Sequence, residues 1–331
     1  MAIKLFLLMT LLSHVASSFS EWCHPQDKMA LLQIKKELNN PIILSSWKSN
    51  TDCCKTSWNG VTCFPSNNRV SELTITDDNN LITSKFPLSV GNLSYLESLS
   101  FYHLPNLTGP IPIKSISELF KLKTLIITRT GMSGTIPNFP AQMEQLTYLD
   151  LSSNHFSGKL PYYLYKLPKL GVISFHDNFL TGPIPPSYGY FNNKNTPTLF
   201  FSHNQLSGRL PISLSRLINP TVIEFSYNKF EGDASMLFGS NKTTREIYLS
   251  QNMFKFDLGK VELPKTLTAL EVSHNQIYGK LPLGIENLYP LNVSYNNLCG
   301  KIPKGGYIHL SDVTSFFHNK CLCGSPLPSC K

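Results

Sequence analysis

The sequence predicts an α/β solenoid of ten repeats that places a parallel sheet on its concave side. Three features of the 331 residues predict this fold. A short motif centred on asparagine recurs every 21 to 26 residues, apolar residues alternate just before each asparagine, and all eight cysteines lie near the two ends. A regular motif in the middle and cysteines at both ends are typical of a stack of similar units with sealed termini.

The repeated motif is clearest at residues 149–161 and 199–211, which both follow the pattern LxLxxNxLxGxIP closely. A period of 20 to 29 residues with this pattern is typical of a leucine-rich repeat, in which each unit contributes one short strand. The ten members of the asparagine position are Asn79, Pro105, Thr130, Asn154, Asn178, Asn204, Asn228, Asn252, Asn275 and Asn296. In the first two repeats the apolar pairs Leu73/Ile75 and Leu99/Phe101 lie one residue further upstream, which suggests a one-residue insertion.

Each position of the motif has a physical role in such a fold. Apolar pairs such as Leu149 and Leu151 alternate with period two, so they point inward while the residues between them face solvent. The asparagine is expected inside, where its amide can bond to backbone groups that the turning chain leaves unpaired. The glycine three positions before the end of the motif supports a turn that other residues resist.

The first 20 residues have the three zones of a secretory signal peptide: Lys4, an apolar run at 5–12 and small residues at 16–18. The apolar run is too short to span a bilayer, and no later stretch is longer. We therefore divide the chain into a signal peptide at 1–20, an N-terminal cap at 21–68, ten repeats at 69–303 and a C-terminal cap at 304–331. The mature protein is expected to be secreted, with no membrane span.

The cysteines form one cluster at each end, and each cluster is expected to fasten a cap through disulfides. The amino-terminal cluster is Cys23, Cys53, Cys54 and Cys63, and the carboxy-terminal cluster is Cys299, Cys321, Cys323 and Cys330. Spacing alone leaves three ways to pair each cluster. A zinc site is disfavoured because the clusters lack paired Cys-x-x-Cys units and an exported protein meets an oxidising environment. A helix is expected after Asp27 and before Asn39, because apolar residues there recur at helical spacing.

Composition and charge narrow the function. Charged residues make up 15% of the chain and the net charge is +8, so we expect adhesion to an acidic matrix, with no cofactor and no nucleic-acid partner. Four Asn-x-Ser/Thr sequons are candidate N-glycosylation sites in a secreted protein: Asn92, Asn106, Asn241 and Asn292.

Catalysis is disfavoured although the outward strand positions carry several carboxylates. Asp150 and Glu224 lie three repeats apart, which places them roughly 14 Å apart on a sheet, too far for a glycosidase pair. Glu224 and Glu246 are close enough, but the sequence indicates no pocket that would desolvate one of them and raise its pKa. The serines of the concave strands recur with the motif, so none is singled out as a nucleophile.

Several segments carry a resemblance to one plant family. These are residues 27–36 with Ser46-Trp47, Asp52-Cys53-Cys54 and Trp58, the segment Phe-Glu-Gly-Asp-Ala-Ser at 230–235, residues 256–261, and the ending Asn-Lys-Cys-Leu-Cys-Gly at 319–324. They resemble the polygalacturonase-inhibiting proteins of plants, from about residue 21 to 331. The resemblance implies a plant-type leucine-rich-repeat fold and the disulfides Cys23–Cys53, Cys54–Cys63, Cys299–Cys321 and Cys323–Cys330.

The resemblance also implies a function and a site. The protein would be an extracellular, cell-wall inhibitor of fungal or insect endopolygalacturonases, held in part by pectin (homogalacturonan), and would not itself be an enzyme. In this family the solvent-facing residues of the concave strands bind the target. By position in the motif, the partner-binding residues expected here are Tyr148, Asp150, His176, Asp177, Phe200, His203, Glu224, Tyr227, Glu246 and Tyr248.

The outward strand positions form an acidic strip on a basic protein. The acids are Glu72, Asp77, Asp150, Asp177, Glu224, Glu246 and Glu271, against the single arginine Arg129. Such a strip would attract a basic partner. Two alternatives stay open, since a leucine-rich-repeat fold does not determine function: a ligand-binding signalling module of the cell wall, and an ice-binding protein.

Overall fold

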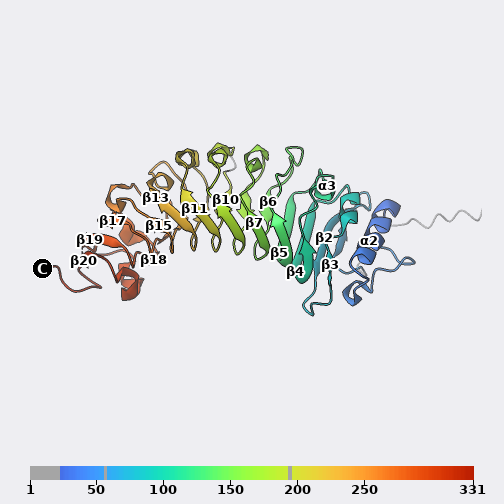
Figure 1. The fold of residues 1–331 in the computed structure, drawn as a ribbon, viewed down its shortest axis with the longest axis horizontal. Coiled ribbons are helices and arrows are strands. Elements are labelled where there is room, and N and C mark those ends of the chain that lie inside the picture. Colours follow the sequence, from blue (N-terminus) through green and yellow to red (C-terminus); the bar gives the residue numbers. More distant parts are fainter. Residues whose placement is uncertain (1–22, 56–57, 193–195) are drawn as a thin grey trace, which may run out of the picture.

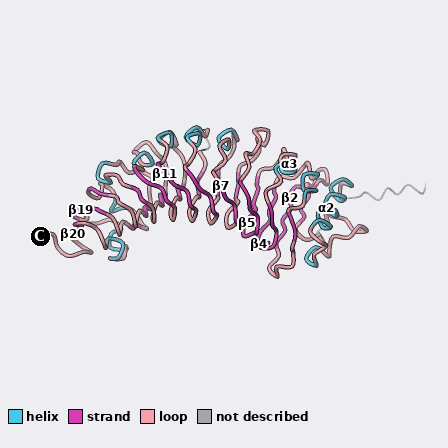
Figure 2. The backbone as a smooth tube through the Cα atoms, in the orientation of Figure 1, coloured by secondary structure: helices cyan, strands magenta, loops and turns pink. Residues whose placement is uncertain are grey.

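The computed structural model describes residues 23–55, 58–192 and 196–331, so the predicted signal peptide lies outside the described residues. The chain forms an arch of stacked coils that runs from the amino-terminal helix α2 (Pro25–Glu37) to the carboxy-terminal strand β20 (Cys321–Cys323). Short helical turns lie along the outer edge of the arch, and the strands lie side by side below them (Figures 1 and 2). The predicted solenoid is confirmed.

The concave sheet is parallel along the whole arch. From the amino end its strands are β2 (Val70–Thr76), β4 (Ser98–Gly109), β5 (Thr124–Thr135), β6 (Tyr148–Asp150), β8 (Val172–Ser174), β10 (Thr198–Phe200), β12 (Val222–Glu224), β14 (Glu246–Tyr248), β16 (Ala269–Glu271) and β18 (Leu291–Asn292). At the amino-terminal edge β1 (Val61–Cys63) pairs antiparallel with β2, so the cap supplies the edge strand. A covered edge cannot pair with another chain.

A second row of parallel strands follows the first along each repeat, which sequence analysis did not predict. Its strands are β3 (Ser84–Lys85), the later halves of β4 and β5, β7 (His155–Gly158), β9 (Phe179–Gly182), β11 (Gln205–Arg209), β13 (Lys229–Gly232), β15 (Met253–Phe254), β17 (Tyr278–Gly279), β19 (Asn297–Lys301) and β20. We call these strands the second sheet.

Helical turns complete the repeats on the outer side. They are α3 (Ile113–Ile116) and the 3-10 helices η1 (Ile42–Leu44), η2 (Leu88–Asn92), η3 (Leu164–Lys166), η4 (Pro186–Tyr190), η6 (Ile212–Arg216), η7 (Ser235–Leu237), η8 (Leu258–Lys260), η9 (Ile285–Asn287), η10 (Ile308–Leu310) and η11 (Val313–Phe316). In the part of the chain that the structure describes, no helix has the length and apolarity that crossing a membrane requires.

The motif positions pack as the sequence predicts. Leu149 and Leu151 are fully buried, and so are their counterparts along the arch. Phenylalanines of three successive repeats stack inside, with ring centroids 5.9 Å apart for Phe175 and Phe201 and 5.6 Å apart for Phe201 and Phe225. Each repeat therefore covers the apolar face of its neighbour, which no single repeat could bury alone.

The asparagine position forms a continuous hydrogen-bonded column. In Asn178, for example, Nδ2 donates to the carbonyl oxygens of Leu151, Phe175 and His176, and Oδ1 accepts from the backbone N–H of Phe156. One side chain thus satisfies groups in its own repeat and in the preceding one, as predicted. The column continues into the C-terminal cap, where Asn319 bonds to Val293 and Leu298 in the same way.

The first two repeats differ from the prediction. Register between β4 and β5 is continuous from Ser98 to Leu104, where Leu104 pairs with Thr130, so the buried Leu104 holds the column position that we assigned to Pro105. The register shifts between Leu104 and Thr108, so the irregularity lies after the column position and not between it and the apolar pair. Asp77 is buried, with its carboxylate accepting from the backbone N–H groups of Asn79 and Ile82. It is therefore an inward-facing residue directly after β2, and it does not belong to the acidic strip.

The N-terminal cap is joined to the repeats by a buried ion pair that sequence analysis missed. Asp27 lies inside α2, and its carboxylate accepts from Nε and Nη2 of Arg69 at 2.9 and 2.8 Å. It also accepts from the backbone N–H of Val70, the first residue of β2. Two donors from one arginine and a backbone bond satisfy the buried charge. Elsewhere in the cap, Trp47 and Trp58 stack with their ring centroids 5.6 Å apart.

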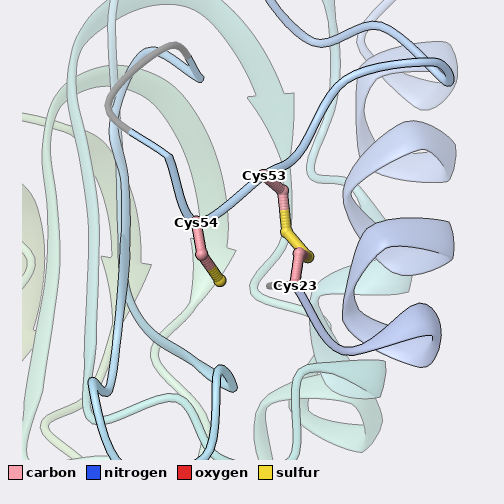
Figure 3. A group of neighbouring side chains, drawn as sticks. All are labelled: Cys23, Cys53 and Cys54. Carbon is pink, nitrogen blue, oxygen red and sulfur yellow. A yellow bond between two sulfur atoms is a disulfide. The ribbon is translucent and has the colours of Figure 1, made fainter. Parts of the chain in front are cut away.

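All eight cysteines are paired as the resemblance implied: Cys23–Cys53, Cys54–Cys63, Cys299–Cys321 and Cys323–Cys330. Figure 3 shows the Cys23–Cys53 bond between the start of α2 and the following loop, with Cys54 beside it. The sulfurs of Cys23, Cys53 and Cys54 lie within 4.8 Å of one another, the spacing of a metal site. Because each is in a disulfide, none offers a thiolate to a metal.

Candidate functional site

The concave strands carry one outward-facing ladder of side chains in exact backbone register. It runs Asp150, Ser174, Phe200, Glu224, Tyr248, Glu271, Asn292 on β6, β8, β10, β12, β14, β16 and β18. Neighbouring members are one strand apart, about 4.8 Å. We call this row the floor ladder. It places one carboxyl group on each side of the Tyr248 phenol, that of Glu224 and that of Glu271.

A groove of about 320 Å³ opens over the carboxy-terminal part of this ladder. Its lining comprises the ladder residues Glu224, Tyr248, Glu271 and Asn292, the residues Ser202, Ser226, Ser250 and Ser273, and the residues His203, Tyr227, Gln251 and His274. These are three parallel columns of the repeat motif. We call this feature the concave groove; it has an acidic floor, a hydroxyl-bearing strip and an aromatic wall.

The aromatic wall is formed by the residues at which the backbone leaves each concave strand in a left-handed conformation. His203, Tyr227, Gln251, His274, Tyr295 and His318 all have φ between 52° and 58°. Side chains at this position leave the backbone in the same direction, so rings stack where neighbouring repeats both carry an aromatic residue, and Gln251 separates two such stacks. The centroids of His203 and Tyr227 are 4.2 Å apart, and Tyr295 lies between His274 at 4.1 Å and His318 at 4.2 Å.

Hydrogen bonds fix the acids of the floor. Glu224 Oε1 accepts from the backbone N–H of Ser226 at 3.0 Å, and Asp150 makes the same contact with Ser152 at 3.0 Å. Tyr248 donates its hydroxyl to Glu246 Oε2 at 3.0 Å. The carboxylates therefore have defined positions before any partner binds, which reduces the entropy lost on binding.

Burial raises the pKa of three side chains in the groove, Glu224, Tyr248 and Glu271. Desolvation raises the pKa of Glu224, with a smaller contribution from the nearby Glu271 charge, and desolvation also raises the pKa of Glu271. The pKa of Tyr248 is raised by burial and by its bond to Glu246. We predicted no pocket of this kind, and that expectation is wrong. Glu224 and Glu271 lie two strands apart, roughly 10 Å, at the upper limit for an inverting carboxylate pair.

The structure brings only some of the predicted site residues together. His203, Glu224, Tyr227 and Tyr248 line the concave groove, and Gln251, Glu271, His274 and Asn292 join them there. Asp150 and Phe200 belong to the floor ladder outside the groove, and Tyr148 and Glu246 lie two positions earlier on their strands. His176 and Asp177 contact each other, Nδ1 to Oδ2, at 3.1 Å. Phe200 is half-buried rather than fully exposed.

The four sequons differ in setting. Asn92, Asn106 and Asn241 are exposed, whereas Asn292 is half-buried in the concave groove. Its Oδ1 accepts from the backbone N–H and the hydroxyl of Ser294 at 3.1 and 2.8 Å. A glycan on Asn292 would occupy the groove, while glycans at the other three sites would leave it open.

Replacing Glu224 by glutamine is expected to raise the melting temperature at neutral pH. Its pKa is higher in the folded than in the unfolded chain, so the folded state binds more protons and loses stability as the pH rises through that interval. Glutamine keeps the bond to Ser226 without the charge. Thermal melts from pH 4 to 8 should show the gain at neutral pH and its loss in acid; a gain that is independent of pH would contradict the assignment. Glu231→Gln, exposed on the second sheet, is the control.

The chain matches family models in three places. Residues 24–64 match the leucine-rich-repeat N-terminal domain, and residues 145–167 and 264–279 match leucine-rich repeats. These matches cover the cap that holds α2 and two of the repeats.

Relatives match over nearly the whole chain. The sequence is 49% identical to a polygalacturonase inhibitor of Pyrus communis, over 98% of each chain. It is 50% identical to polygalacturonase inhibitor 2 of Arabidopsis thaliana, over 99% of this chain and 98% of that one. The chain belongs to the polygalacturonase-inhibiting protein family. The resemblance predicted from the cap segments is thereby confirmed.

A solved structure of a plant ice-binding protein is also similar to this member of the polygalacturonase-inhibiting family. The two are 44% identical, with a TM-score of 0.89, over 93% of this chain and 98% of the other. Plant proteins with this shared framework are thus named for different functions. The surface side chains, rather than the fold, have to distinguish them.

Proposed function

We propose that this protein is secreted to the plant cell wall, where it binds and inhibits microbial endopolygalacturonases through its concave face. The observation that carries the proposal is the concave groove, in which Glu224 and Glu271 flank Tyr248 beside a wall of stacked rings. The family relatives named as polygalacturonase inhibitors support the choice of target.

The chemistry of the groove suits a basic side chain of the partner. A lysine or arginine entering between Glu224 and Glu271 would meet two carboxylates and the faces of Tyr227 and Tyr248. Charge pairing raises the association rate, and desolvated aromatic contacts supply most of the affinity. Tyr148, Asp150, His176, Asp177, Phe200, His203 and Glu246 extend the same surface toward the amino end.

The role proposed for the carboxylates is binding rather than catalysis. Glu224 and Glu271, the two glutamates whose pKa is raised, both line the open concave groove. The relatives are named as inhibitors. The test is residual hydrolysis of polygalacturonate by a panel of fungal and insect enzymes with the purified protein added. Inhibition of at least one enzyme is expected, together with no release of reducing sugar by the protein alone. A protein that hydrolyses the substrate itself, or that inhibits none of the panel, would contradict the proposal.

We expect the protein to bind de-esterified pectin at low salt. Exposed basic residues recur in the strands of the second sheet or directly after them, at Lys159, Arg209, Lys229, Lys255, Lys280 and Lys301. The Arg209 side chain lies across Gly232 of the next repeat, and that of Lys280 lies across Gly300, so the charges follow the arch. A column of pectin should release the protein within a few tenths molar salt, as the screening length falls below about 10 Å. Retention that resists salt, or equal retention on a neutral polysaccharide, would oppose this.

The two alternative functions fit these surfaces less well. An ice-binding face would need a flat, regular array of small polar side chains, whereas the second sheet presents Phe179, Lys229 and Met253 among its exposed residues. The concave strip mixes acids with stacked rings. A signalling role would use the same groove for a ligand, so it predicts binding without loss of polygalacturonase activity in the panel.

A further inference from the structure

A second groove lies at the other end of the arch, between the cap helix α2 and η2. Its volume is about 530 Å³, and its lining residues are Gln26, Met29, Ala30, Gln33 and Asn92. The four helical residues are spaced i, i+3, i+4 and i+7, so they form one face of α2. The remaining wall residue, Asn92, is the last residue of η2. We call this the cap groove.

Asn92 is also the acceptor of a sequon, Asn92-Leu93-Ser94, and its side chain is exposed while Leu93 is buried. We propose that an N-linked glycan on Asn92 folds back into the cap groove and fastens α2 to the first repeats. The attachment residue itself lines the groove, so the first sugars need no long linker to reach the helix face. This inference is independent of polygalacturonase binding.

The lining of the groove suits a neutral sugar. Although the net charge of the chain is +8, none of the described residues that line the groove is charged. Gln26 and Gln33 offer amide donors and acceptors for hydroxyl and N-acetyl groups. Met29 is 64% exposed, an apolar side chain without a cover, and it lies beside the small Ala30. A sugar has both apolar ring faces and polar hydroxyl groups, and ligand sites commonly combine apolar walls with a few polar groups.

Covalent attachment makes weak contacts sufficient. A tethered group has an effective concentration in the millimolar range, so contacts too weak to retain a free sugar still hold the glycan in place. Contacts that exist only when α2 is docked stabilise the docked state. The glycan would therefore act on the same junction as the Asp27–Arg69 ion pair and the Cys23–Cys53 disulfide.

The sequon should be removed at Asn92 and not at Ser94, because Ser94 accepts a hydrogen bond within the cap. Arg69 Nη2 donates to Ser94 Oγ at 3.1 Å while it also holds Asp27, so Ser94→Ala would disturb the cap directly. Asn92→Gln removes the glycan and leaves that network intact. Asn241→Gln is the matched control, since it removes an exposed sequon between η7 and β14, far along the arch.

The experiment uses the full protein secreted from plant cells. Glycopeptide mass spectrometry should find Asn92 occupied. Asn92→Gln should then speed hydrogen exchange in residues 26–33 several-fold and lower the melting temperature by about 2 °C, and Asn241→Gln should do neither. An unoccupied Asn92, or equal effects of the two variants, would overturn the proposal.

A second measurement separates docking of the glycan from its mere presence. Met29→Ala is made with and without Asn92→Gln, and melting temperature and exchange are compared across the four proteins. If the glycan contacts Met29, the alanine change should weaken the cap only in the glycosylated background, because coupled sites are not additive. Equal effects in both backgrounds would overturn the proposal, since Met29 would then act without the glycan.

Discussion

Glu224→Lys is expected to weaken polygalacturonase binding about thirtyfold or more, which corresponds to about 2 kcal/mol, the loss typical of an interface anchor. The change reverses the charge in the middle of the acidic floor, one strand from Tyr248 and two from Glu271. A basic partner would meet repulsion where it now meets attraction, and the half-buried site gives solvent little access to screen it. The dissociation constant, measured by surface plasmon resonance at 0.15 M salt, gives the result.

The matched control is Glu231→Lys, which makes the same charge change at an exposed position on the second sheet. It should leave the dissociation constant within about twofold of the parent, since rim and remote charges contribute little to affinity. Phe200→Ala on the floor ladder should also weaken binding, through lost contact area. If Glu231→Lys weakened binding as much as Glu224→Lys, net charge rather than the concave groove would be responsible.

Removing the Cys23–Cys53 disulfide by replacing both cysteines with alanine is expected to destabilise the N-terminal cap by about 3 to 4 kcal/mol on chain-entropy grounds. Because repeats contact mainly their neighbours, the loss should stay near that end. Hydrogen exchange should accelerate first in α2 and β2, while β18 keeps its protection.

The control replaces Cys323 and Cys330 with alanine and so removes a disulfide at the opposite end of the arch. That disulfide closes a loop with a sequence separation of 7. Its effect should be confined to β19 and β20. Uniform acceleration along all the repeats in either variant would mean that the arch unfolds as one unit, and the picture of locally stabilised caps would fail.

The sequence predicted the features that repeat. Leu149, Leu151 and Asn178 sit where their period places them, because each recurs in a column that the stack must bury or bond. The C-terminal continuation was missed because Asn319 follows a 3-10 helix, η11, instead of a strand and so lacks the preceding apolar pair. Leu104 was missed because a column position depends on register between strands, which the motif does not encode when its asparagine is missing. Asp77 was assigned to the outward strip because period two does not indicate that its carboxylate turns inward to the backbone N–H groups of the following loop.

The site was predicted in part for the same reason. Outward positions follow from period two, so Glu224 and Tyr248 were identified. The raised pKa values of Glu224 and Glu271 depend on what surrounds each carboxyl group across three strands, which a linear reading does not contain. The Asp27–Arg69 pair joins residues 42 positions apart and belongs to no repeat, so no periodic signal could reveal it.

Hydroxyl-radical footprinting of the protein alone and in complex with an inhibited polygalacturonase tests the central claim most directly. Reactive side chains lie on both surfaces: Phe200, Tyr227 and Tyr248 along the concave strands, and Phe179, Met253 and Tyr278 on the second sheet. We expect the complex to protect the first three and to leave the other three unchanged. Protection of Phe179, Met253 and Tyr278 with unchanged oxidation of Phe200, Tyr227 and Tyr248 would place the enzyme on the second sheet and contradict the account.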